Sequence, residues 1–194
     1  LHTGYDMTPE ERIAKNHRNY TLLLKQLEAE KDNPYLYYQL GKTCEITGDF
    51  SKACEYYDKA LCYDLDPELA YVQALVVSYG NALLLTGQHE KALGFEGIYQ
   101  EFSSLADFVY LMGNIYTANG MYEAATDEYQ KALDIPLCRQ NGANSFLPMY
   151  QTGQMFAELG DYETAADCYR QCGDFRPAQD ALLSIISLTA SHPK

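Results

Sequence analysis

The chain has 194 residues, of which 47% are hydrophobic, and a formal net charge of −13; this is enough for one globular domain or one continuous repeat array. No apolar run approaches the roughly 18 residues that a membrane span needs. The negative charge disfavours binding to nucleic acid or anionic lipid. It lies entirely in residues 32–194, because residues 1–31 hold five basic and five acidic residues. An ordinary acidic surface and an acidic groove for a basic partner both stay open.

The first predicted element is a helix of about 20 residues. Thr8 can cap it, Pro9 suits its first turn, and Glu11 completes a capping box. Apolar residues then recur at helical spacing as far as Leu27, and we expect the helix to close near residues 31–34. The chain begins at Leu1 rather than at Met, so we expect a segment excised from a longer protein.

The first residues lack the basic, apolar and small-residue stretches of a secretory signal. We therefore expect a cytoplasmic protein whose six cysteines are buried thiols rather than disulfides.

A fixed spacing of two glycines and an alanine then recurs four times. The second glycine follows the first by seven residues, and the alanine comes five residues later. Each set predicts two antiparallel helices, with the second glycine in the turn and the alanine facing the first helix; the recurrence indicates a helical solenoid. The sets are Gly41/Gly48/Ala53, Gly80/Gly87/Ala92, Gly113/Gly120/Ala125 and Gly153/Gly160/Ala165. The expected helix pairs are 34–47 with 50–64, 67–86 with 88–102, 104–119 with 121–134, and 145–159 with 161–173.

Aromatic residues complete the repeat pattern. A ring follows the second glycine by two residues, and in three units a tyrosine follows the alanine by four; we expect these tyrosines to fill the seam to the next helix pair. With the Asp66-Pro67 stop after the first unit, the pattern resembles the tetratricopeptide repeat over nearly all of residues 34–173. The resemblance implies an all-α, right-handed solenoid. The rings are Phe50, His89, Tyr122 and Tyr162, and the tyrosines are Tyr57, Tyr129 and Tyr169.

The second unit departs from this pattern. Glu96 stands in place of the expected aromatic residue and Tyr99 in place of a late alanine. Gly94 and Gly97 fall inside its second helix, where each glycine costs about 1 kcal/mol relative to alanine. We expect this helix to be the least regular of the array.

After the fourth unit, Pro177–Leu188 is predicted to form a closing helix, because a solenoid needs an end cap over its last apolar face. Its inward residues are expected to be Ala181, Leu182, Ile185 and Ile186. The predicted organisation is a lead-in segment (1–33), four repeats in 34–174 (about 34–66, 67–103, 104–140 and 145–174), and a cap with its tail (175–194).

No catalytic or metal-binding arrangement emerges from the sequence. Asp64-Leu65-Asp66 matches the metal-binding DxD of sugar-nucleotide enzymes, but it closes a helix before Pro67, as acidic residues often do. Cys168 and Cys172 share a helix face, yet no histidine is placed to complete a site. The sequence has no Gly-rich phosphate loop. We predict no catalytic residue, metal or cofactor in this chain.

The best candidate site is the inner groove, which the first helix of each pair lines in tetratricopeptide proteins. On each of these first helices, two positions four residues apart lie on the groove-facing side. Carboxamides there suit the backbone of an extended peptide, and tyrosines offer flat contact area that also suits sugars. Alternatively, the tyrosines only pack between helices. The residues are Lys42, Asn81, Asn114 and Gln154 just after the first glycines, and Tyr38, Val77, Tyr110 and Tyr150 three residues before them. Because Val77 and Tyr110 replace charges that carboxylate-binding members carry, we do not expect chaperone-tail binding.

The lead-in segment carries a second resemblance. His2-Thr3-Gly4-Tyr5, Lys15-x-x-Arg18-Asn19 and Leu22-Leu23-Leu24 resemble the segment that follows the catalytic domain of bacterial family 2 glycosyltransferases. This implies a parent enzyme whose sugar-donor site lies upstream of Leu1. The alternative is an ordinary capping helix.

Three functions follow as hypotheses. The first is non-catalytic binding of a peptide or protein segment in the groove. The second is an accessory region of a glycosyltransferase, which would bind the acceptor, including a glycan, or pair subunits. The third is a homodimerisation module, favoured if the irregular second repeat exposes apolar surface.

Overall fold

The computed structural model describes residues 8–191, and every regular element in that range is a helix. The predicted all-α repeat fold is thus confirmed, whereas the His-x-Gly-Tyr segment at residues 2–5 lies outside the described residues. The chain divides into two compact units between Gln88 and His89; we call them the N-terminal and the C-terminal unit. Within residues 8–191, none of the helices combines the length and hydropathy that a membrane span requires.

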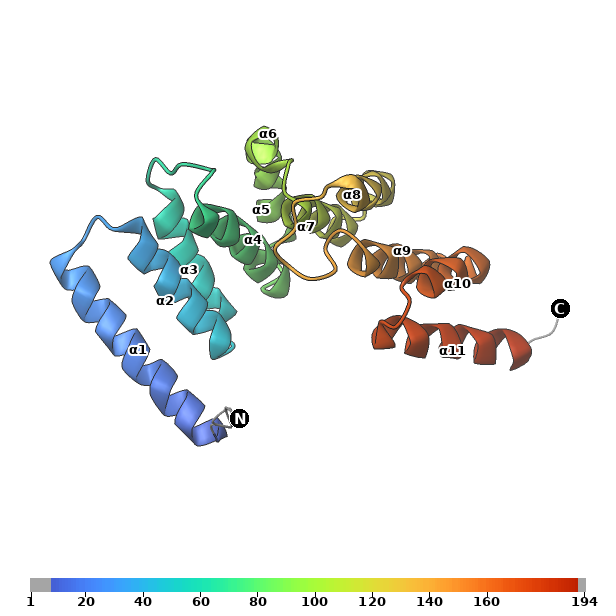
Figure 1. The fold of residues 1–194 in the computed structure, drawn as a ribbon, viewed down its shortest axis with the longest axis horizontal. Helices are drawn as coiled ribbons and strands as arrows, with labels where there is room; N and C mark the ends of the chain where they lie inside the picture. The colour runs from blue at the N-terminus through green and yellow to red at the C-terminus, as the bar shows by residue number, and fades with distance from the viewer. Residues whose placement is uncertain (1–7, 192–194) are drawn as a thin grey trace. The chain divides into compact units, whose positions relative to one another are not determined.

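The N-terminal unit contains four helices: α1 (Pro9–Ala29), α2 (Pro34–Ile46), α3 (Phe50–Leu61) and α4 (Ala70–Leu85). Helix α1 packs on α2, α2 pairs with α3, and α4 packs on both (Figure 1). The predicted capping box opens α1: the Thr8 hydroxyl accepts from the Glu11 amide at 3.2 Å, and the Thr8 amide donates to the Glu11 carboxylate at 2.8 Å.

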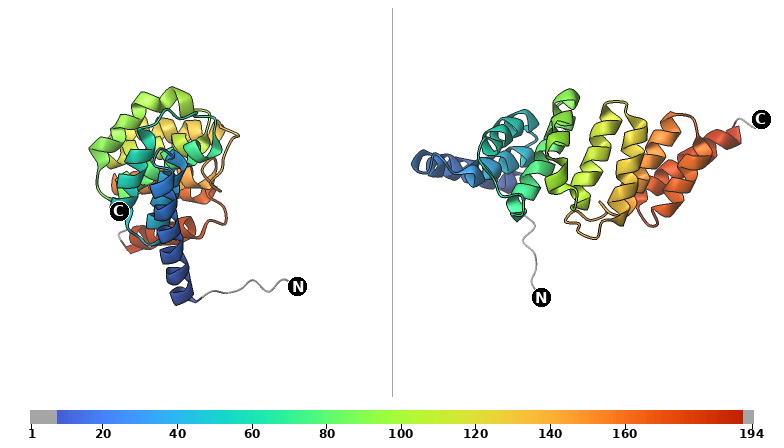
Figure 2. Two further views of the ribbon diagram at one scale, coloured as in Figure 1. Left: turned by 90° about the vertical axis from the view of Figure 1, so that its left-hand side faces the viewer. Right: turned by 90° about the horizontal axis from the view of Figure 1, so that it is seen from above.

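The C-terminal unit holds two regular helix pairs and a closing helix. The pairs are α7 (Ala106–Ala118) with α8 (Tyr122–Asp134) and α9 (Phe146–Glu158) with α10 (Tyr162–Gln171), and α11 (Arg176–Ser191) packs on α10 (Figure 2). Before them come α5 (His89–Ala92), a 3₁₀-helix η1 (Leu93–Ile98) and α6 (Tyr99–Phe102).

The second glycine of each set lies in the predicted turn. These glycines have φ of +78° (Gly48), +72° (Gly87), +73° (Gly120) and +82° (Gly160), a left-handed conformation that glycine adopts far more readily than other residues. The alanines that follow them are all fully buried. Both predictions are confirmed.

The first glycine makes room for the tyrosine of its own repeat. A Cβ added at Gly41 would lie within 3.0 Å of the Tyr57 ring, so the ring rests directly on the backbone of the paired helix. The same holds for Gly113 with Tyr129 and for Gly153 with Tyr169. Our expectation that these rings fill the seam to the next pair was incomplete, because each ring first packs on its own pair.

The second repeat is irregular, as predicted. Its second helix is broken into α5, η1 and α6, and Gly94 and Gly97 both lie in the 3₁₀ segment. Phe95 and Phe102 are nonetheless buried, with ring centroids 6.4 and 5.5 Å from that of Phe108. The segment therefore keeps its large aromatic side chains inside, and the exposed apolar surface that would have favoured dimerisation is not found on these rings.

The two unusual residues of this repeat contact the next one. The Tyr99 hydroxyl donates to the buried Glu128 carboxylate of α8 at 2.5 Å. Burial, reinforced by the nearby Glu96 carboxylate, raises the pKa of Tyr116 of α7 to about 12. Both unusual residues thus interact with the neighbouring repeat, Tyr99 through a hydrogen bond and Glu96 through its charge.

The closing helix covers the last repeat, as predicted. Ala178 and Ile185 are buried against α10, and Ala181 and Leu182 pack on the same cluster. The prediction for Ile186 was wrong: it is 50% exposed, because it lies about 100° around the helix from Ile185 and so leaves the packed face.

Candidate functional site

In the N-terminal unit, the predicted groove residues come together on two touching helices. Tyr38 and Lys42 lie on α2, and Val77 and Asn81 on α4, all of them half-buried. The Lys42 ammonium links the helices, donating to the Ser78 hydroxyl of α4 at 3.3 Å. This ammonium also pairs with the Glu45 carboxylate at 2.5 Å. The sequence pattern did not reveal that pairing, although Glu45 stands one helical turn after Lys42.

The hydroxyl of Tyr57 lies near Glu45 of this ion pair. It is fully buried and forms no hydrogen bond with any residue in the described range, although Glu45 and Ser78 lie beside it. Burial, reinforced by the Glu45 carboxylate, raises the pKa of Tyr57 far above its usual value. The phenol therefore stays protonated at neutral pH.

Three tyrosines, Tyr35, Tyr38 and Tyr71, form a contiguous aromatic surface beside these polar groups; we call it the tyrosine patch. The Tyr71 ring centroid lies 5.2 Å from that of Tyr35 and 6.0 Å from that of Tyr38, and the Tyr35 and Tyr38 centroids are 6.0 Å apart. Tyr35 is 45% exposed, and the other two are half-buried. Of the three, the sequence pointed to Tyr38 alone, although Tyr35 precedes it by one helical turn.

In the C-terminal unit, the corresponding residues are engaged more deeply in internal contacts. Tyr110 is only 8% exposed, and the Gln151 amide of α9 lies 3.5 Å from its hydroxyl. The Asn114 carbonyl oxygen accepts from the Tyr129 hydroxyl at 2.9 Å. Tyr150 packs on Tyr169, with ring centroids 5.8 Å apart. These contacts match the alternative interpretation, in which tyrosines pack between helices.

Gln154 is the remaining predicted residue of this unit. It lies half-buried on α9, four residues after Tyr150. Gln154 therefore stands one helical turn after Tyr150, just as Asn81 stands one turn after Val77 on α4.

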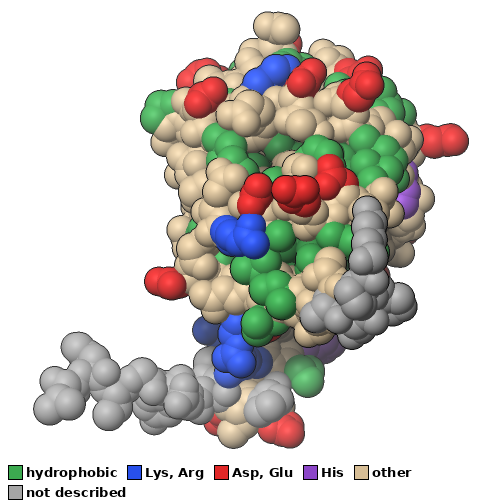
Figure 3. Space-filling view, turned by 90° about the vertical axis from the view of Figure 1, so that its right-hand side faces the viewer, with side chains coloured by type: hydrophobic (Ala, Val, Ile, Leu, Met, Phe, Trp, Pro, Cys, Tyr) green, Lys and Arg blue, Asp and Glu red, His purple; other side chains and the backbone are tan. Residues whose placement is uncertain are grey.

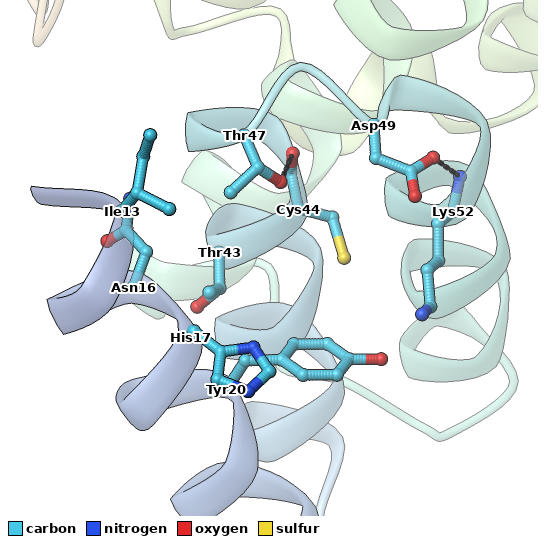
Figure 4. Close-up of a pocket in the computed structure, with 9 residues that line it drawn as sticks. All are labelled: Ile13, Asn16, His17, Tyr20, Thr43, Cys44, Thr47, Asp49 and Lys52. Atoms are coloured by element: carbon cyan, nitrogen blue, oxygen red, sulfur yellow. Dashed lines mark hydrogen bonds between the residues drawn. The ribbon is translucent and has the colours of Figure 1, made fainter. Parts of the chain in front are cut away.

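A cleft of about 230 Å³ lies between α1, α2 and the start of α3. In Figure 4, the side chains of His17 and Tyr20 from α1 face those of Thr43 and Cys44 from α2. The Lys52 ammonium lies 4.8 Å from the centroid of the Tyr20 ring, a cation–π contact. Burial raises the pKa of the Cys44 thiol; such a thiol is a poor nucleophile, so the cleft offers little for covalent chemistry.

The cysteines form no other site. None of the six forms a disulfide; Cys44, Cys54, Cys168 and Cys172 are buried, as predicted, whereas Cys62 is exposed and Cys138 partly so. Within residues 8–191, no three His, Cys, Asp or Glu side chains are grouped closely enough to hold a metal ion.

Family models of the tetratricopeptide repeat match the chain at residues 34–67, 106–136 and 149–178. These ranges do not include the irregular second helix of the second repeat. A comparison with curated proteins found no match.

Solved structures share the fold. A MamA fragment of Desulfovibrio magneticus RS-1 is 24% identical, covering 87% of this chain and 90% of its own, with a TM-score of 0.68. Another MamA structure is 18% identical, covering 96% and 99%, with a TM-score of 0.66. A thermophilic tetratricopeptide-repeat protein of Thermus thermophilus is 15% identical, covering 90% and 92%, with a TM-score of 0.63. At these identities the likeness concerns the fold alone. The chain therefore carries tetratricopeptide repeats and has the all-helical fold of a tetratricopeptide-repeat solenoid.

Proposed function

We propose that the chain is a non-catalytic scaffold that binds an extended peptide segment of a partner protein on the first helices of its repeats. The observation that carries this proposal is the surface of α2 and α4, where the tyrosine patch lies one helical turn before Lys42 and Asn81 lies farther along α4. Exposed tyrosines give large contact area at low entropic cost, and a carboxamide can both donate to and accept from a peptide backbone.

The two units contribute unequally in this proposal. In the N-terminal unit Tyr38 is half-buried, whereas Tyr110 at the equivalent position of the C-terminal unit is only 8% exposed and Asn114 is hydrogen-bonded to Tyr129. Peptide binding is therefore assigned to the N-terminal unit.

The test is a peptide array probed with the whole chain, followed by fluorescence anisotropy on the peptides that bind. The variant Asn81→Ala should weaken binding about tenfold, as expected when a buried hydrogen bond to the ligand is lost, with an unchanged melting temperature. Asn114→Ala is the matched control: it removes an internal acceptor, so it should lower the melting temperature. Unchanged affinity of Asn81→Ala for every bound peptide would contradict the assignment.

A second candidate is the accessory region of a glycosyltransferase, proposed from the resemblance of residues 1–30. Lys15 and Arg18 are both exposed on α1, where they would be available to an adjoining domain. The coding sequence upstream of Leu1 tests this candidate. A catalytic domain with an acidic metal-binding motif is expected there, and an unrelated sequence would exclude it.

A further inference from the structure

We propose that Asn141 is a site of spontaneous deamidation, through which the loop between the third and fourth repeats changes as the protein ages. This loop joins α8 to α9 (Figure 1) and contains Asn141-Gly142, one of two Asn-Gly pairs in the sequence; the other is Asn119-Gly120. Glycine after asparagine has no side chain to hinder its backbone nitrogen, and its main chain is free to rotate. The two pairs differ in how firmly they are held. This chemistry does not depend on the proposed peptide binding.

The reaction needs only these two residues and water. The backbone nitrogen of Gly142 attacks the side-chain carbonyl carbon of Asn141. A new C–N bond forms and closes a succinimide ring, while the side-chain nitrogen leaves as ammonia with the proton that the backbone nitrogen loses. Water then opens the ring at either carbonyl, which gives aspartate or isoaspartate. The balance includes no oxidant, reductant or cofactor.

Asn119 is held in a form that resists this attack. Its side-chain amide donates to the carbonyl oxygens of His89 at 3.0 Å and of Ile115 at 2.8 Å. The attacking group is held as well, since the Gly120 amide donates to the Thr117 carbonyl oxygen at 3.0 Å. These bonds must break before a succinimide can form, and each of them therefore raises the barrier.

Asn141 has none of these restraints. Its side chain is exposed. Among residues 8–191, neither its side-chain amide nor the backbone nitrogen of Gly142 has a hydrogen-bond partner. The side chain can therefore turn onto this nitrogen without first losing a bond.

The same loop contains a restrained asparagine for comparison. Asn144 is followed by Ser145, and its side-chain amide donates to the Ile135 carbonyl oxygen at 3.1 Å. Of the two loop asparagines, only Asn141 thus combines an unrestrained amide with a following glycine.

Burial of Gly142 opposes the reaction. The Phe146 ring lies against this glycine, and a Cβ added there would be 2.3 Å from a ring atom. Local opening of the loop must therefore admit solvent to the backbone nitrogen. We expect Asn141 to react more slowly in the folded protein than in the unfolded chain, but faster than Asn119.

Deamidation would alter the turn that fixes the loop to α7. The Ala143 amide donates to the Gln140 carbonyl oxygen at 3.1 Å, which closes a turn around Asn141. The Gln140 amide in turn donates to the buried Asp107 carboxylate at 2.5 Å. Isoaspartate carries the main chain through its side chain and so inserts a methylene group into this turn. The two hydrogen bonds cannot then both keep their geometry, and the connection that places α9 loosens.

The new negative charge is unfavourable as well. Residues 89–194 contain six basic and fourteen acidic residues, and acidic side chains are prominent on the face of the C-terminal unit shown in Figure 3. A further carboxylate increases the repulsion within this unit. Both products carry this charge, whereas only isoaspartate lengthens the main chain.

The experiment incubates the whole chain at mildly alkaline pH, both folded and in urea. Trypsin places the two Asn-Gly pairs in separate peptides, 92–131 and 140–170, and fragmentation mass spectrometry locates each replacement of NH₂ by OH. In the folded protein we expect Asn141 to react at least about tenfold faster than Asn119, which must first lose several hydrogen bonds. In urea the two should react at similar rates. Equal rates in the folded protein, or an unchanged folded Asn141 after the urea sample has reacted, would overturn the proposal.

Variants test the structural consequence by hydrogen exchange. The Asp107 carboxylate protects the backbone amides of Arg139 and Gln140. In the aged parent protein these amides should exchange at least about tenfold faster than in fresh protein, because the bonds are lost. Aged Asn141→Gln should keep slow exchange, since its longer side chain closes a ring far less readily. Equally slow exchange in the aged parent would overturn the loosening, and equally fast exchange in fresh Asn141→Asp would overturn the role of isoaspartate.

Discussion

At the scale of single residues, two tyrosines occupy the same place in their repeats but have different partners. Tyr129 donates to Asn114 at 2.9 Å and lies 3.0 Å from the Thr117 hydroxyl. In the repeat of Tyr57 the equivalent positions hold Lys42 and Glu45, which bind each other, and the Tyr57 hydroxyl has no hydrogen-bond partner among the described residues. A buried polar group without a partner destabilises the fold.

This difference predicts opposite effects of the same substitution. Tyr57→Phe removes a buried hydroxyl without breaking a hydrogen bond, so the free energy of unfolding should stay the same or rise. Tyr129→Phe leaves Asn114 unpaired and should lower it by about 1 kcal/mol. Urea unfolding of both variants provides the measurement. An equal loss in the two variants would show that the Tyr57 hydroxyl is satisfied in solution.

The glycines and alanines of the repeat could be predicted from the sequence, because each has a steric task that fixes its spacing. The state of the groove residues could not. Whether Lys42 faces a ligand or pairs with Glu45, and whether Asn114 is available or holds Tyr129, depends on side-chain competition that spacing does not reveal. Tyr71 was missed because it joins Tyr35 and Tyr38 from another helix.

At the scale of elements, the 3₁₀ segment of the second repeat is the clearest departure from a regular array. Two glycines weaken the helix there, while the burial of Phe95 and the hydrogen bond from Tyr99 to Glu128 hold the chain in place. The sequence predicted the irregularity from Gly94 and Gly97. It did not predict that Glu96 and Tyr99 would bind the next repeat, since that requires knowing which residues of α7 and α8 face them.

Glycine substitutions test this picture. An added Cβ at Gly94 or Gly97 meets no atom within 4 Å, and neither residue has a positive φ. Gly94→Ala and Gly97→Ala should each raise the free energy of unfolding by about 0.5–1 kcal/mol, mainly by restricting the unfolded chain. The control is Gly113→Ala, which collides with the Tyr129 ring and should destabilise the protein. Chemical denaturation of the three variants gives the comparison, and destabilisation by Gly94→Ala would show that the 3₁₀ segment needs its glycine.

The connection between the third and fourth repeats is held just as specifically. The carboxylate of Asp107, only 4% exposed, accepts from the backbone amides of Arg139 at 2.8 Å and Gln140 at 2.5 Å. A long loop is thereby fixed to the start of α7, which places α9 for its pairing with α10.

At the scale of the whole molecule, buried tyrosines contribute to the response to alkali. Burial is the main cause that raises the pKa of Tyr116 and of Tyr169 to about 12, from an unperturbed value near 10. The folded state therefore holds these protons more tightly than the unfolded state does. Their contribution to stability is fully present below pH about 10 and is lost as the pH rises towards about 12.

We accordingly expect the melting temperature to fall between pH about 10 and pH about 12, in step with phenolate absorbance. Tyr116→Phe should make this fall shallower, because one of the protons held more tightly by the folded state is gone. Glu96→Gln should do so more weakly, since it removes the second cause of the shift and leaves burial. Melting curves at successive pH values provide the test, and an identical slope in Tyr116→Phe would rule out this origin.

The interactions of Glu96 and Tyr99 with the following repeat also bear on how such an array can change in evolution. A repeat that packs only on itself can be duplicated or lost as a cassette. Removal of residues 67–103 would leave Tyr116 without Glu96 and the buried Glu128 without Tyr99. The second and third repeats are thus expected to be inherited together. Deletion of one of them should require compensating substitutions in the other.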